Sequence, residues 1–227
     1  MRVRVLLAAG VVLASLLSPI AADAASTTPS AANAISKDKA KKLAKAALLK
    51  KTDLPGYQSG RQQADPTDAQ YDAALYDCVG AVKPKYIVDN PGLAFTKGQL
   101  EIDSQASVVD TGKHAKADAK ALNTAKGATC YQQVLRSAFE DQGVIVNTIS
   151  VKLAKATVEG VRTAFAFKYD LTGTINGAPI RLQGFDLNVL VGQTEVGLSI
   201  YRYDGKRPKL NQLVLLAAPL VERIRAV

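Results

Sequence analysis

The sequence predicts a single α+β domain with a curved antiparallel sheet of about five strands, helices packed on one face of the sheet, and one disulfide. Three observations support this fold class. Apolar residues recur at helical spacing in several segments before residue 142, a period of two dominates the chain after residue 143, and the chain has only two cysteines. The predicted domain, 36–227, is long enough to bury one continuous core.

The N-terminal residues have the pattern of an export signal. Arg2 and Arg4 precede a nearly unbroken apolar stretch that is too short to span a bilayer, and Ala22-Asp23-Ala24 is of the kind that signal peptidase accepts. We expect a protein that is secreted or associated with the cell wall, without a transmembrane anchor. The predicted segments are a signal peptide over 1–24, a flexible leader over 25–35 and the domain over 36–227.

The chain is basic, with 29 lysines and arginines against 20 acidic residues and a formal net charge of +9. Such a surplus attracts anionic partners through long-range electrostatics. Wall polymers and lipid headgroups are the partners expected outside the cell, where nucleic acid is rarely met, so we expect no nucleic-acid partner. The alternative is that the charge serves only solubility.

Five segments have the pattern of helices. The first begins at Ser36, a residue type that caps helix N-termini, and it carries lysines on its outer side. It is either a solvated surface helix or a membrane-surface helix, although its apolar side is mostly alanine. Pro219 is expected to kink the last helix. The predicted helices are 36–50, 67–80, 111–126, 129–141 and one from Pro208 onward, with a turn at 53–56.

Cys78 and Cys130 both fall on the apolar side of a predicted helix. In an oxidising compartment two cysteines allow a single pairing, so we expect a disulfide that holds these two helices together. The alternative is a redox-active or metal-binding pair, but the chain has no Cys-x-x-Cys spacing and only one histidine. A bridge over a loop of this length stabilises a fold by roughly 4 kcal/mol.

Five segments alternate apolar and polar residues, as strands with one solvated face do. Ile145 and Ile149 are expected on the same side of their strand, and Asn176-Gly177 predicts a hairpin. The apolar residues of the returning strand change parity at Gly184, which we interpret as a β-bulge. The predicted strands are 100–108, 145–153, 161–171, 180–191 and 196–200.

The sequence contains no recognisable catalytic or cofactor motif. Its single histidine, His114, begins a solvated helix, and no Gly-x-Ser-x-Gly turn, phosphate-binding glycine loop or metal-ligand spacing is present. We therefore expect no enzymatic activity, no cofactor and no metal. Carboxylate pairs leave a wall-polymer hydrolase as an alternative, which the lack of tryptophan disfavours. The carboxylates on or near strands are Glu101, Asp103, Glu159, Asp170, Asp186 and Glu195.

Two features suggest a ligand-binding surface. Asp186 lies beside the expected bulge, which would turn its carboxylate toward a concave face. A second group combines aromatic and basic side chains near a strand end, as residues that grip an anionic headgroup do. The alternative is an ordinary edge strand with a charged turn. The members of this second group are Tyr201, Arg202, Tyr203, Lys206 and Arg207.

The order of several short motifs resembles a known family. They are a lysine- and alanine-rich helix ending in Leu48-Leu49, the segment Asp53-Leu54-Pro55-Gly56-Tyr57, a helix bearing Cys78, an alternating strand, Cys130-Tyr131 opening a helix, and a strand meander closed by a leucine-rich helix. Over roughly 36–227 the chain resembles the actinobacterial secreted sensor domains, and in particular the extracellular sensor domain of PknH-type receptor serine/threonine kinases.

The resemblance implies a domain that binds a ligand in a cleft between a curved sheet and helices and that lacks enzymatic activity. The chain departs from the family in having cysteines for one disulfide rather than two, and neither a kinase nor a transmembrane segment. The resemblance therefore implies a free, secreted, sensor-like protein. Together with the basic charge of the chain, it leads us to expect binding of an anionic or amphipathic envelope component. The expected partners are a small-molecule, lipid or cell-wall ligand and a membrane-bound receptor.

An envelope lipid carrier of the half-barrel type is a further alternative. Such a carrier shelters acyl chains in an elongated apolar void between sheet and helices. The same side chains would equally suit a filled core. The residues concerned are Phe165, Phe167, Tyr169 and Leu171.

Overall fold

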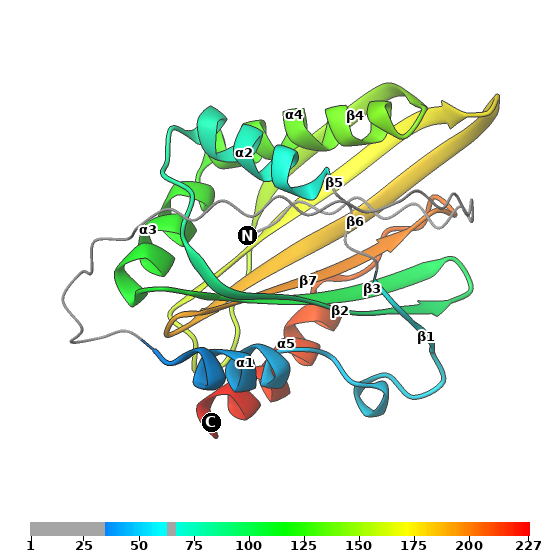
Figure 1. Ribbon diagram of the computed structural model, residues 1–227. Coiled ribbons are helices and arrows are strands. Elements are labelled where there is room, and N and C mark those ends of the chain that lie inside the picture. The colour runs from blue at the N-terminus through cyan, green and yellow to red at the C-terminus, as the bar shows by residue number, and fades with distance from the viewer. Residues whose placement is uncertain (1–34, 63–66) are drawn as a thin grey trace, which may run out of the picture.

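A seven-stranded antiparallel sheet forms the centre of the computed structural model, which describes residues 35–62 and 67–227. The strands lie in the order β1-β2-β3-β7-β6-β5-β4 (Figure 1). The predicted signal peptide and the leader up to residue 34 lie outside the described residues. The strands are β1 (Gln58–Arg61), β2 (Tyr86–Lys97), β3 (Leu100–Val109), β4 (Val144–Lys155), β5 (Thr163–Ile175), β6 (Ala178–Val191) and β7 (Thr194–Arg202).

The helices cover both faces of the sheet, so the expectation of helices on one face is wrong. One pair of helices packs on the face that we call the α5 face, and three pack on the other, the α4 face (Figure 1). The cause is that residues 182–190 of β6 are buried without interruption, so both sides need a cover. The α5 face carries α1 (Lys37–Ala46) and α5 (Leu210–Arg225); the α4 face carries α2 (Asp68–Val79), α3 (Gly112–Leu122) and α4 (Ala125–Asp141). No helix in the described ranges is long and apolar enough to cross a membrane.

The five expected strands correspond to β3 through β7, and the prediction of about five is wrong because it omits β1 and β2. β2 contains Asn90-Pro91-Gly92, which has the composition of a turn. The strand passes through it because the register against β3 shifts between Pro91 and Ala94. Gly92 also permits a close approach, since an ideal Cβ there would lie 2.4 Å from the Ser104 carbonyl oxygen. The composition therefore marks an irregularity inside a strand.

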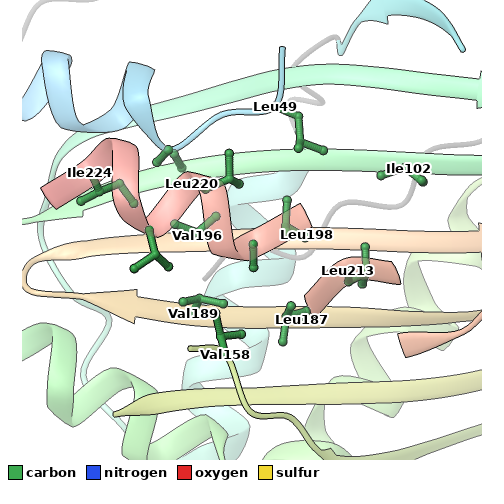
Figure 2. Packing of buried hydrophobic residues seen from close by; sticks show 14 of the residues in the cluster. Leu49, Ile102, Val158, Leu187, Val189, Val196, Leu198, Leu213, Leu220 and Ile224 are labelled. Atoms are coloured by element: carbon green, nitrogen blue, oxygen red, sulfur yellow. The ribbon is translucent and has the colours of Figure 1, made fainter. Parts of the chain in front are cut away.

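The core of the α5 face brings the first and last described helices together. Leu213 and Leu220 of α5 point toward the sheet, where they meet Leu187 of β6 and Leu198 of β7 (Figure 2). α1 lies beside α5 (Figure 1), and its buried apolar residues belong to the same core. This packing occupies the side that a membrane-surface helix would expose, which disfavours that alternative. The buried residues of α1 are Ala40, Leu43 and Ala44.

The disulfide joins two helices on the α4 face. Cys78 of α2 and Cys130 of α4 are bonded, with their Cα atoms 5.7 Å apart, which confirms the predicted pairing. In the same core the Tyr131 ring stacks on Phe167 with ring centroids 4.7 Å apart, and Phe167 meets Phe165 edge to face. The aromatic residues of β5 therefore pack as a filled core, which is the alternative to a lipid-lined void.

β6 has no bulge at Gly184, contrary to the sequence interpretation. It pairs with both β5 and β7 without a register shift. Its apolar residues change parity because the strand turns Leu182 toward the α4 face and Phe185 toward the α5 face. Gly184 instead leaves room for the ring of Tyr169, the residue opposite it on β5.

Replacing Gly184 with alanine is expected to lower the free energy of unfolding by about 2 kcal/mol. An ideal Cβ would lie 2.5 Å from the Tyr169 hydroxyl oxygen and 2.6 Å from the Ile200 carbonyl oxygen, which cannot retreat without disturbing the pairing of β6 with β7. Urea denaturation measures the loss. Gly60→Ala is the control, because a Cβ at that position on β1 meets nothing within 4 Å. Equal effects of the two changes would contradict this explanation.

The sheet does contain a bulge in β4. The register against β5 shifts between Val146 and Thr148. Ile145 and Ile149 were expected on the same side of the strand, but the bulge places them on opposite sides. The Ile145 side chain is 70% exposed as a result. Beyond the bulge, Thr148, Ser150 and Lys152 alternate with the apolar residues that face α4 and so share the α5 face.

The predicted helix over 111–126 ends earlier than expected, and the next begins earlier. α3 ends at Leu122 and α4 begins at Ala125. Thr124 caps α4 by accepting a hydrogen bond from the Gly127 N–H at 2.9 Å. Gly127 fits against the end of α3, since an ideal Cβ would lie 2.1 Å from the Leu122 carbonyl oxygen. The last helix, α5, continues through Pro219.

Candidate functional site

A polar groove lies on the part of the α5 face that the helices leave open. α5 packs mainly against β6 and β7, and α1 against β2 and β3, so β4 and β5 extend beyond both helices. A cavity of about 460 Å³ is present there, a volume typical of sites for small molecules. We call it the basic groove. Its cationic side chains are Lys152, Lys168, Arg181 and Arg207.

Three neighbouring strands form the floor of the groove in a regular register. Period-two alternation buries the aromatic residues of β5 on the α4 face and places the polar residues between them on the α5 face. The Thr148 and Thr172 hydroxyl oxygens are hydrogen-bonded at 2.6 Å. The cross-strand pairs are Lys152 with Lys168, Ser150 with Asp170 and Thr148 with Thr172 between β4 and β5, and Asp170 with Gln183 and Thr172 with Arg181 between β5 and β6.

One carboxylate, Asp170, holds the two arginines of the groove in place. Its Oδ2 atom accepts a hydrogen bond from Arg181 at 3.1 Å and another from Arg207 at 2.9 Å. The Gln183 amide donates to the same oxygen. Partial burial raises the pKa of Asp170, but the hydrogen bonds from Arg181 and Gln183 outweigh it and leave the pKa below its ordinary value. Asp170 therefore stays ionised and fixes the guanidinium groups.

The two lysines of the groove face each other across neighbouring strands. Lys152 lies directly opposite Lys168 on the neighbouring strand, and like charges in this position destabilise a sheet. Neither lysine forms an ion pair with another residue in the described ranges. With four cationic side chains and one carboxylate in the lining, three positive charges of the groove stay unbalanced. An anion placed there would reduce the repulsion between these charges.

A separate group of acids lies on the α4 face. Asp103 of β3 is opposite Ser199 of β7, which is in turn opposite Asp186 of β6, so the two aspartates flank a small residue. The Tyr131 hydroxyl donates to Asp186 Oδ2 at 2.5 Å. Glu101 lies two residues before Asp103 on the same face, and all three acids are buried. We call Glu101, Asp103 and Asp186 the carboxyl cluster.

Burial gives the carboxyl cluster unusual titration. It raises the pKa of Asp103 to about 8, with a further rise from the neighbouring Glu101. Burial also raises the pKa of Glu101, and it raises the pKa of Asp186 to about 6 although the hydrogen bond from Tyr131 partly offsets the effect. One carboxyl oxygen of Asp103 has no hydrogen-bond partner among the described residues. The pKa values of Asp103 and Asp186 therefore lie closer to neutral pH than those of exposed carboxylates do.

The structure divides the predicted site residues between the two faces. Tyr201 is buried on the α4 face near the carboxyl cluster, and the Tyr203 ring packs edge to face against it. Arg202 lies opposite Gln183 of β6 and is paired with Asp204. Lys206 is exposed in the turn, where its backbone N–H donates to Asp204.

Of the six residues predicted to bind a ligand, Arg207 lines the basic groove, as does Asp170 from the carboxylates considered for a hydrolase. Asp186 belongs to the carboxyl cluster and is hydrogen-bonded to Tyr131. The sequence analysis missed the groove lysines and Arg181. The polar positions between the aromatic residues of β5 were a usable signal, because they include Lys168 and Asp170. No group of three or more His, Cys, Asp or Glu side chains in the described part of the chain is suited to holding a metal ion.

Comparison with solved structures finds similarity to the extracellular domain of a receptor kinase. No family model matches the chain, and no curated protein matches it. Among solved structures, the extracellular domain of PknH from Mycobacterium tuberculosis is similar with a TM-score of 0.47 and 12% sequence identity, over 86% of this chain and 99% of that chain. This is the resemblance that the sequence motifs predicted.

Proposed function

We propose that this protein is a non-catalytic, sensor-like binding domain that acts outside the cytoplasm and takes an anionic ligand of the cell envelope in the basic groove. The observation that carries the proposal is the directly opposed pair Lys152 and Lys168 on the floor of a cavity of about 460 Å³. A cross-strand pair of like charges costs stability. A ligand that neutralises both lysines recovers that cost on binding.

The arginines supply pre-organised donors to the same ligand. Arg181 and Arg207 are already held by Asp170, so little side-chain freedom is lost when their remaining N–H groups bind an anion. The groove is open and polar, which suits a soluble or surface-displayed anion better than an acyl chain. The disulfide is consistent with a location in an oxidising compartment.

Two alternatives are less well supported. A lipid carrier needs a long apolar void, whereas the aromatic residues of β5 pack against Tyr131 in a filled core. A glycan hydrolase needs two carboxyl groups that a polymer can reach. Asp103 and Asp186 have raised pKa values but are only 7% and 9% exposed, so a chain of sugars has no access to them in this conformation.

Changing Lys168→Glu is expected to abolish anion binding and, at the same time, to raise the free energy of unfolding by about 0.5 kcal/mol. Lys168 lies across from Lys152, so the change turns a repulsive pair of like charges into an attractive pair of unlike charges. Isothermal titration with inorganic pyrophosphate at low ionic strength measures binding, because exposed charges are weakly screened there. Urea denaturation measures stability. A gain in stability with a loss of binding separates a functional role of Lys168 from a structural one.

The control is Lys42→Glu, which makes the same charge change on the exposed side of α1. It is expected to lower pyrophosphate affinity much less than Lys168→Glu does, because Lys42 is not among the residues that line the groove and its charge does not face Lys152. Equal losses in the two variants would mean that pyrophosphate responds only to net charge. The absence of binding by the unmodified protein would contradict the proposed function itself.

A further inference from the structure

The charge arrangement in the basic groove favours a ligand group with two negative charges. Lys152 and Lys168 are opposed across two strands, where Cβ atoms are about 5 Å apart. A single group between their ammonium ions must neutralise both. A phosphate monoester carries a charge of about −1.5 to −2 at neutral pH, whereas a carboxylate or a phosphate diester carries one negative charge.

Asp170 adds discrimination against carboxylates. It is the one carboxylate in the groove lining and already binds Arg181 and Arg207 through a single oxygen. An anion that binds the remaining guanidinium N–H groups is repelled by Asp170, and its attraction to the cationic side chains must exceed that repulsion. A dianion with tetrahedrally arranged oxygens gains more from the lysines and arginines together than a planar monoanion does.

Hydroxyl groups line the other side of the groove. Ser150, Thr148 and Thr172 lie on the same floor as the lysines, and the two threonine hydroxyls are 2.6 Å apart. A hydrogen bond between them uses one proton, which leaves the second proton and the oxygen lone pairs for a ligand. The cavity of about 460 Å³ is also much larger than a phosphate group. Hydroxyl-bearing carbon chains or sugars match this polar, neutral side.

We propose that the basic groove binds a phosphate monoester attached to a polyol, an inference that rests on the proposed anion-binding function of the same groove. The phosphate lies over Lys152 and Lys168 within reach of Arg207, and the polyol lies along Thr148 and Thr172. The same chemistry occurs in soluble phosphorylated polyols, in phosphorylated wall polymers and in lipid headgroups with a terminal phosphate.

Isothermal titration with four soluble probes tests the selectivity. Glycerol 3-phosphate is expected to bind about tenfold more tightly than glycerate or glycerophosphoglycerol, because of its additional charge near two ammonium groups, and glycerol alone is expected not to bind. The preference should shrink at pH 5, where the monoester has gained a proton. Equal affinity for the monoester, the diester and the carboxylate would overturn this inference and leave the anion-binding function intact. Failure of all three anions to bind would overturn both.

Thr172→Val tests the polyol side, because valine keeps the shape of threonine and removes the hydroxyl. Glycerol 3-phosphate is expected to lose about fivefold in affinity, the loss of one neutral hydrogen bond, while inorganic phosphate keeps its affinity. Thr174→Val, two residues further along β5 and outside the groove lining, is the matched control. Unchanged affinity of Thr172→Val for glycerol 3-phosphate would contradict the placement of the polyol.

Vesicle sedimentation separates the sources of the ligand. Binding to vesicles that contain phosphatidylinositol 4-phosphate, whose inositol ring bears a phosphate monoester, but not to vesicles with phosphatidylinositol, would identify a lipid headgroup. Binding to glycerol 3-phosphate without binding to either vesicle would identify a soluble or polymer-borne ester. Binding to both vesicle types with equal strength would contradict selectivity for the monoester.

Discussion

Replacing Cys78 and Cys130 together with serine is expected to lower the free energy of unfolding by about 4 kcal/mol. The bridge spans a sequence separation of 52 residues, and its removal returns the conformational freedom of that loop to the unfolded chain. The loss should be felt first in α2, which packs mainly against α4. Amide hydrogen exchange should therefore show α2 losing protection before the sheet does.

Urea denaturation of the double serine variant measures this loss, with the slope of the transition compared as well as its midpoint. The unmodified protein under reducing conditions is the matched control, because it lacks the same bond with the original residues in place. The two should agree within about 1 kcal/mol. A loss below about 1 kcal/mol in both would show that contacts between the helices, rather than the bridge, hold α2 in place.

Asp103→Asn is expected to reduce the fall in stability between pH 4 and pH 8, to which the raised pKa values of Asp186 and Glu195 also contribute, and to raise the free energy of unfolding at pH 8 by about 3 kcal/mol. Burial raises the pKa of Asp103 to about 8 in the folded state, from an ordinary value of 3.8. The folded protein thus binds more protons than the unfolded chain within this window, so stability is highest near pH 4 and falls as pH rises toward 8. Asparagine cannot ionise and avoids that loss.

Urea denaturation at several pH values tests the sign as well as the size of the effect. Asp186 titrates in the same direction and keeps a smaller slope in the variant, because burial raises its pKa to about 6. Asp170→Asn is a control with the opposite sign. Hydrogen bonds from arginine and glutamine hold the pKa of Asp170 below its ordinary value, so this residue contributes stability that is lost as pH falls. If the unmodified protein becomes more stable from pH 5 to pH 8, Asp103 is not buried as the structure has it.

The sequence was informative where local chemistry determines structure. Asn176-Gly177 predicted the hairpin between β5 and β6, and the structure agrees because both residues adopt positive φ angles, of 50° and 78°. Ser36 was predicted as an N-cap, and its side chain does accept a hydrogen bond from the Lys39 N–H. The disulfide followed from the count of cysteines in the chain.

The errors arose where distant segments determine structure. The change of parity in β6 looked like a bulge because one strand does not reveal that both of its faces are covered by helices. The basic groove depends on the register of three strands, so Lys152 and Lys168 meet only in the folded sheet. Asp186 was predicted to face a ligand because of a bulge that the structure does not contain, and its hydrogen-bond partner Tyr131 lies 55 residues earlier in the chain.

The position of β7 has a consequence for how the chain folds. β7 follows all the other strands in sequence, yet it lies between β3 and β6, with Val108 paired to Thr194 and Leu100 to Arg202. Until β7 arrives, the sheet exists at most as two halves, β1-β2-β3 and β4-β5-β6, whose inner edges are unpaired. Closing so distant a contact is slow. A chain that is synthesised from its N-terminus therefore exposes the unpaired edges of two half-sheets until its C-terminal part appears. Chaperones or dilution should raise the yield of folded protein most at this stage, because unpaired strand edges promote aggregation.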